Sequence, residues 1–193
     1  MKRLLWIVIS LLVPSAVSAD VVGVYADPTG YCLLLDTPGP KTLYVLQKFT
    51  LGSVASRFRV ELSPGFTGSL VSTSGGIVEG DLMSGATVTY PDCQSGTVEV
   101  LDLQFMMLGT STECSWVRIA PHPLSPDGLV DVYSCDMQRN GADWQGTHVQ
   151  HSIFLFCPDL FEGENHNPPS CTPFTPPLAT EAATWGRVKA LYR

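Results

Sequence analysis

ASRFRVEL, residues 55–62, alternates charged and apolar side chains from its third residue onward and decides the fold class. A strict period of two is the pattern of a β-strand with one buried face and one face in water. One face of this strand would carry Phe58, Val60 and Leu62, and the other would carry Arg57, Arg59 and Glu61. The stretch therefore predicts a half-buried strand.

Further short runs of strand-forming residues lie on both sides of this strand. They are residues 20–26, 31–35, 42–49, 70–74, 86–90, 97–108, 115–120, 129–135 and 147–157. Compositions typical of turns separate them, including Asn140-Gly141. The turn composition of residues 27–30 predicts that the first two runs pair as a hairpin.

Many short strands and frequent turns, without an alternation of strands and helices, favour an all-β fold. We therefore predict a disulfide-braced antiparallel β-sandwich, or a partly open barrel, with a short C-terminal helix. The sandwich is expected to occupy residues 20–157.

The cysteines are even in number and widely spaced, which is typical of a disulfide framework in an exported chain. They are Cys32, Cys93, Cys114, Cys135, Cys157 and Cys171. Six cysteines allow fifteen pairings, and spacing alone does not select one. Our working prediction is Cys32–Cys93, Cys114–Cys135 and Cys157–Cys171.

The N-terminus has the three parts of a secretory signal peptide. Lys2 and Arg3 precede an apolar run over residues 4–13, and Val17 and Ala19 occupy the small-residue positions of a cleavage site. The apolar run is about half of what a bilayer span requires. Residues 1–19 are therefore predicted to be cleaved, which leaves no transmembrane anchor and places the protein in the periplasm or outside the cell.

The C-terminus changes in composition after the last strand run. Residues 158–179 are rich in proline and predict an irregular connector. Residues 180–193 predict a short amphipathic helix whose apolar stripe would contain Trp185, Val188, Leu191 and Tyr192. Such a helix would form only when docked, either as a lid on its own sandwich or as a sorting or assembly handle.

The composition and the missing motifs argue against several functions. The formal net charge of −7 provides no basic patch for nucleic acid. No nucleotide-binding, zinc-protease or nucleophile-elbow motif is present, so neither an enzyme nor a cofactor is indicated.

Metal binding is weakly indicated. His148 and His151 are the closest histidines, but on a strand they would point to opposite faces. Asp127, Asp131 and Asp136 flank one strand run without the spacing of a calcium loop. We therefore expect no metal site.

Three aromatic residues are candidates for a binding surface, namely Trp144, Trp116 and Tyr133. Exposed aromatic side chains on a sandwich recognise carbohydrate or protein, although core and edge packing explains most aromatic residues. Trp144 lies among turn-forming residues and is expected to be the most exposed.

The N-terminal GVYAD of residues 23–27, the dispersed cysteines and the terminal TWGRVKALYR resemble a group of secreted bacterial proteins. That group shares a G-x-Y-x-D start and a TWGxVKxLYR ending, and it has no established activity. The resemblance implies a small exported bacterial domain and transfers no functional residue.

Together these features predict an exported, non-catalytic β-sandwich that binds a protein or carbohydrate, or forms part of the cell envelope or an extracellular assembly. The alternative is a secreted hydrolase with a dispersed polar site that acts on a polysaccharide. A hydrolase should have a cleft with convergent catalytic groups. A binding module should have a flat aromatic face or an unpaired sheet edge.

Overall fold

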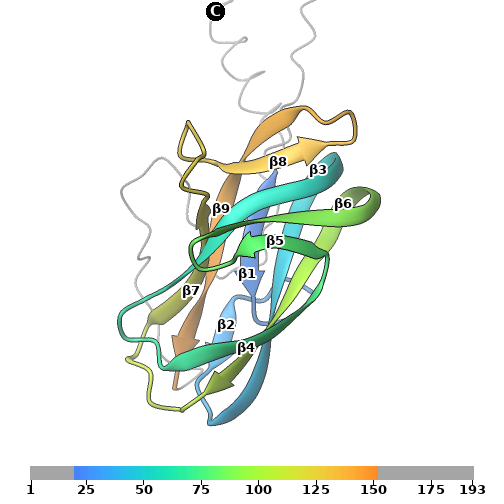
Figure 1. The fold of residues 1–193 in the computed structure, drawn as a ribbon. Helices are drawn as coiled ribbons and strands as arrows, with labels where there is room; N and C mark the ends of the chain where they lie inside the picture. Colours follow the sequence, from blue (N-terminus) through green and yellow to red (C-terminus); the bar gives the residue numbers. More distant parts are fainter. Residues whose placement is uncertain (1–19, 152–193) are drawn as a thin grey trace, which may run out of the picture. The chain divides into compact units, whose positions relative to one another are not determined.

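A computed structural model describes residues 20–151 of the chain, and this part consists of β-strands without a helix (Figure 1). The strands are β1 (Val21–Tyr25), β2 (Leu33–Leu35), β3 (Gly39–Leu62), β4 (Gly68–Gly75), β5 (Ile77–Asp81), β6 (Gly85–Met107), β7 (Ser115–Pro121), β8 (Val130–Ser134) and β9 (Arg139–Gln150). The fold is an all-β sandwich braced by a disulfide, as predicted.

β3 is the organising strand, because it pairs with β1, β6, β7 and β8. Residues 55–62 form its second half, where Phe58 and Val60 are buried at 0% and 1% exposure. Arg57, Arg59 and Glu61 remain partly exposed on the other face. The alternation in the sequence is therefore confirmed as a half-buried strand.

The two halves of β3 belong to different parts of the sandwich. The first half pairs with β1 and the second half with β7, while β9 pairs with both β1 and β7. These four pairings form a closed circuit of strands around the core. Its largest fully buried side chains include Phe58, Phe105, Leu43, Leu101, Leu103, Met107 and Ile119.

β3 and β6 are each longer than the sequence predicted, because each joins two expected strands. Residues 42–49 and 55–62 both belong to β3, and residues 86–90 and 97–108 largely form β6. The two strands remain paired through several register shifts near residues 45–55. Phe49 takes a left-handed backbone conformation there, with φ 64°. The two-stranded ribbon bends at this point. The bend is produced by β-bulges within continuous strands and not by an interruption of either strand.

β4 and β5 follow one another along the side of β6 opposite β3 (Figure 1). Gly75 aligns with Leu101 of β6, whereas Ile77 aligns with Thr89. Between these two positions β6 forms ladder pairs, among the described strands, only with β3, and Gly76 N donates to Val100 O at 3.1 Å. The sequence had not predicted β5.

The predicted first hairpin is wrong. The turn itself exists, since Gly30 N donates to Asp27 O at 3.1 Å and Ala26 N to Tyr31 O at 2.6 Å. However, β1 and β2 both run parallel to β9, and they pair with successive segments of it. The turn connects two strands that run in the same direction along β9. A local sequence pattern does not distinguish such a connection from the reversal of a hairpin.

The turn predicted at Asn140-Gly141 is also wrong. Both residues lie in β9, where Asn140 aligns with Val132 of β8 and Gly141 with Asp131. The chain reverses earlier, where Met137 N donates to Ser134 O at 2.8 Å. Pairing with β8 overrides the turn preference of the dipeptide.

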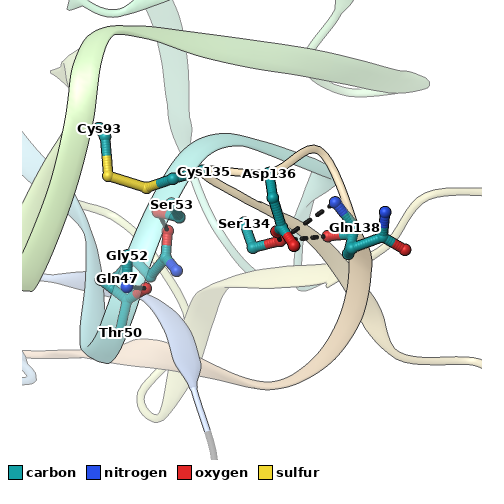
Figure 2. The surroundings of a disulfide bond; sticks show 9 residues. All are labelled: Gln47, Thr50, Gly52, Ser53, Cys93, Ser134, Cys135, Asp136 and Gln138. Carbon is teal, nitrogen blue, oxygen red and sulfur yellow. Dashed lines mark hydrogen bonds between the residues drawn. A yellow bond between two sulfur atoms is a disulfide. The ribbon is translucent and has the colours of Figure 1, made fainter.

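The disulfide joins Cys93 of β6 to Cys135, which directly follows β8 (Figure 2). The predicted pairs Cys32–Cys93 and Cys114–Cys135 are therefore wrong. β6 and β8 lie on either side of β3 at Ser53, which aligns with both Gln94 and Ser134. Cys93 and Cys135 are brought together by the pairing of their strands with β3, so the spacing of the cysteines along the chain does not predict the bond. Cys114 is also disulfide-bonded.

The disulfide passes over a position of β3 that has no side chain. A Cβ atom on Gly52 would lie 2.9 Å from Sγ of Cys135 and 3.5 Å from Sγ of Cys93. Figure 2 shows Gly52 and Ser53 beside the bond. Glycine therefore allows the bond to cross the strand closely.

Gly52→Ala is expected to lower the free energy of unfolding by about 1–3 kcal/mol through overpacking. In a Cys93→Ser, Cys135→Ser background the loss should be smaller, because the two unlinked side chains can move apart. Urea unfolding of the four proteins in this double-mutant cycle measures the coupling. Leu51→Ala, at a neighbouring position that is 86% exposed, is the control and should change little. Equal losses in both backgrounds would refute the steric explanation.

A buried hydrogen-bonded cluster lies beside this crossing. The Gln47 side chain, at 0% exposure, accepts through Oε1 from Ser53 Oγ at 3.0 Å and Tyr90 OH at 2.8 Å. Ser56 Oγ also donates to Oε1 at 3.2 Å, and Gln47 Nε2 donates to Asp20 Oδ2 at 3.3 Å. A connected polar cluster of this kind favours one arrangement of the bend.

Several predictions fall outside residues 20–151. These are the signal peptide 1–19, the connector 158–179, the tail 180–193 with Trp185, Val188, Leu191 and Tyr192, and the cysteines Cys157 and Cys171. They remain predictions. Within the described part, the structure has no helix that is long and apolar enough to cross a membrane.

Candidate functional site

Two of the predicted aromatic residues meet around an arginine on the surface of β7 and β9. The Arg118 guanidinium carbon lies 4.4 Å from the ring centroid of Trp116 and 4.8 Å from that of Trp144. Trp116 and Arg118 share a face of β7 because they are two residues apart. Trp144 reaches the same cation from β9. We call these three residues the tryptophan–arginine stack.

An acidic side chain of β3 fixes the position of the central arginine. Glu61 aligns with Arg118 in the β3–β7 pairing. Its Oε2 accepts from Arg118 Nε at 2.8 Å and lies 2.7 Å from the second guanidinium nitrogen. Glu61 Oε1 also lies 2.5 Å from Arg59. The stack is thus held by cation–π contact and by an ion pair on neighbouring strands.

A second ionic cluster surrounds Asp131 of β8, whose side chain is fully buried. Arg57 donates to Oδ2 through Nε at 2.7 Å and also through its second nitrogen. Arg139 Nε donates to Oδ1 at 2.6 Å, and Ser125 Oγ to Oδ2 at 2.9 Å. Both oxygens of this carboxylate are occupied by protein donors.

The remaining aspartates of the suggested calcium set are engaged by different partners. Arg139 lies 2.7 Å from Asp127 Oδ1, and this hydrogen bond lowers the pKa of Asp127. Asp136 accepts from Ser134 Oγ instead. Arg139 thus bridges Asp127 and Asp131, whereas Asp136 bonds to Ser134.

His122 borders the arginines of β3. Burial and, secondarily, the charge of Arg57 lower its pKa. Its Nδ1 accepts from Leu124 N at 3.1 Å, an interaction that favours the neutral ring because an accepting Nδ1 carries no proton. The histidine is therefore part of the local turn.

The structure does not bring Tyr133 to the tryptophan–arginine stack. Tyr133 of β8 aligns with Arg139 of β9, whereas Trp116 aligns with His148. At the rise of an extended strand these two positions on β9 are roughly 30 Å apart. Trp144 is half-buried within β9 and packs against the core, so it is less exposed than the sequence suggested.

The two candidate metal-ligating histidines have different environments. His148 is 5% exposed, while His151 is exposed just beyond β9. His151 Nε2 lies 2.6 Å from Ser111 O. Among residues 20–151 no group of three or more histidine, cysteine, aspartate or glutamate side chains is placed to hold a metal ion.

Sequence reasoning identified both tryptophans but missed Arg118 and Glu61. The sequence did contain a pattern that points to Arg118, because SWVRIAP of β7 alternates and places Trp116 and Arg118 on one face. The contribution of Glu61 depends on the pairing of β3 with β7. No pattern within either strand reveals this pairing.

Comparison with known proteins relates the fold to one type of module. No protein-family model matches this sequence, and no curated protein matches it either. A chain of the CaDoc0917–CaCohA2 complex matches with a TM-score of 0.50 at 10% identity, over 69% of this chain and 99% of that chain. The sixth cohesin of scaffoldin B from Acetivibrio cellulolyticus, in complex with a Cel5 dockerin, gives the same TM-score, identity and coverage.

The described residues therefore have a β-sandwich fold similar to that of a cohesin module. The match covers nearly the whole length of those modules. At this level of identity the similarity concerns the fold alone.

Proposed function

We propose that the protein is an exported, non-catalytic binding module that engages a protein partner in the cell envelope or an extracellular assembly. The observation that carries the proposal is the tryptophan–arginine stack, on a sandwich whose fold is similar to that of a cohesin. The cohesin from scaffoldin B is described in complex with a dockerin, which supports a protein partner for a fold of this kind.

The composition of the stack favours protein recognition. Tryptophan and arginine are, with tyrosine, the residues most enriched among those that dominate binding energies at protein interfaces. Here Glu61 and the two rings already hold the arginine in place, so little side-chain entropy remains to be lost on binding. The Arg118 side chain is 25% exposed.

The same geometry favours a protein over a carbohydrate. Sugars stack on an open aromatic face, but one face of each tryptophan is occupied by the Arg118 guanidinium. The disulfide at Cys93 and Cys135 supports an oxidising compartment. The predicted signal peptide and the resemblance to secreted bacterial proteins agree with export.

Affinity capture tests the proposal. The mature protein, residues 20–193, is immobilised and exposed to envelope and extracellular fractions of the cells that produce it. The partner should be retained by wild type and by Tyr133→Ala, the aromatic control distant from the stack. Trp116→Ala should weaken binding of the purified partner by about 30-fold, as for a hot-spot residue, measured by calorimetry.

Two results would refute the proposal. Equal binding by Trp116→Ala and wild type, with unchanged melting temperatures, would exclude the stack as the interface. Release of reducing ends from a polysaccharide by the purified protein would instead support the hydrolase alternative.

A further inference from the structure

The first described strand, β1, follows directly after the predicted cleavage site. That site is the bond between Ala19 and Asp20, and β1 begins at Val21. The strand lies between β3 and β9 and pairs with both of them (Figure 1). All of its residues are buried. The chain therefore enters the middle of the sheet almost immediately after the bond that signal removal must cut.

The backbone that follows this bond is already hydrogen-bonded. Asp20 O accepts from Asp143 N at 2.9 Å. Val21 aligns with Lys48 of β3 on one side and with Asp143 of β9 on the other. The register with both neighbours continues to Gly23. The N–H and C=O groups at the start of β1 are therefore used by its ladder partners.

Side chains also hold β1 in place. Tyr25 OH donates to Gln145 Oε1 at 2.6 Å. Thr147 Oγ1 donates to Val24 O at 2.7 Å. A Cβ atom on Gly23 would lie 2.8 Å from Cβ of Gln145, so β1 and β9 are packed closely there. Release of β1 from the sheet would break these contacts together.

We propose that the fold makes its own processing site inaccessible, so that the Ala19–Asp20 bond is hydrolysed only while β1 is outside the sheet. Cleavage requires backbone that is exposed and not already hydrogen-bonded. A peptidase binds such a segment as an extended strand, and residues 20–23 cannot add to a second protein while they pair with β3 and β9. Hydrolysis adds water across the bond and leaves a carboxylate on Ala19 and an ammonium on Asp20.

The order of the two events decides the product. Signal removal before the insertion of β1 gives the mature sandwich, whereas a chain that folds first remains a precursor that retains residues 1–19. The relative rates of cleavage and folding thus set how much mature protein is released. This inference rests on the export part of the proposed function and does not depend on the tryptophan–arginine stack.

Digestion of the precursor, residues 1–193, with a purified signal peptidase tests the inference. Precursor that is diluted from urea directly into the peptidase should be cut readily. Precursor that has first refolded with its disulfides should be cut at least about 100-fold more slowly, because opening a core strand requires much of the global free energy of unfolding. Intact mass identifies the product that begins at Asp20.

A linker variant shows whether burial of β1 causes the resistance. A flexible linker of about six glycine and serine residues, inserted between Ala19 and Asp20, should allow the folded precursor to be cut as fast as the unfolded one. The same linker inserted after Gly128, in the exposed loop before β8, is the matched control and should leave the folded precursor resistant. Urea unfolding verifies that both variants fold.

The outcomes separate this inference from the proposed function. Equal rates for folded and unfolded wild-type precursor overturn the inference, as does a folded variant with the linker before Asp20 that stays resistant. If even the unfolded precursor is not cut, the inference falls together with the export on which it rests. The capture experiment uses residues 20–193 and depends on none of these rates.

Discussion

Replacing Cys93 and Cys135 together with serine is expected to lower the free energy of unfolding by about 4 kcal/mol. The bond closes a loop with a sequence separation of 42 residues, and the chain-entropy model gives about this value for such a loop. The bond also ties the bent ribbon of β3 and β6 to the end of β8. Urea unfolding of the oxidised proteins measures the difference.

The double variant is preferable to chemical reduction, because reduction would also open the disulfide of Cys114. Intact mass after alkylation verifies that no other cysteine has become free. A loss below about 1 kcal/mol would contradict the chain-entropy estimate for this bond.

Asp131→Asn is expected to lower the free energy of unfolding by about 3 kcal/mol. The substitution keeps the shape of the side chain but leaves Arg57 and Arg139 facing an amide in place of a buried carboxylate. Removing one partner of a buried ion pair typically costs about 3–5 kcal/mol. We take the lower end because the two arginine side chains are 23% and 31% exposed, so water stabilises them partly.

Asp136→Asn is the matched control for this prediction. It makes the same chemical change only five positions away, at an exposed carboxylate bonded to Ser134. A much smaller change in the free energy of unfolding is expected there, because the carboxylate is exposed. If both variants lose the same stability, the effect is a general response to lost negative charge and the cluster around Asp131 is not its source.

The strands and the fold class were readable from the sequence because their signals are local. The alternation from Arg57 to Leu62 requires only that one face be buried, and the structure buries Phe58 and Val60. β7 and β8 likewise follow their predicted runs closely. The period of side chains along a strand is a property of that strand alone.

The partners of the strands were not readable, because pairing joins residues distant in the chain. The turn at Asp27 was recognised, but its strands pair with β9, more than a hundred residues later. The disulfide failed for the same reason, since Cys93 and Cys135 meet only when β6 and β8 both flank β3. The sequence predicted the two tryptophans of the tryptophan–arginine stack. It did not predict the contact of Glu61 with Arg118, which depends on the β3–β7 register.

The position of β9 at the end of the described chain has a consequence for biosynthesis. β2 pairs with no other strand among residues 20–151, so Leu34 lacks its sheet partner until Val149 has been made. At usual rates of translation, on the order of ten seconds separate these two residues. The β2–β9 pairing therefore cannot form until nearly all of residues 20–151 have been made. This interval is available to a chaperone or an export factor that holds the chain before the pairing forms.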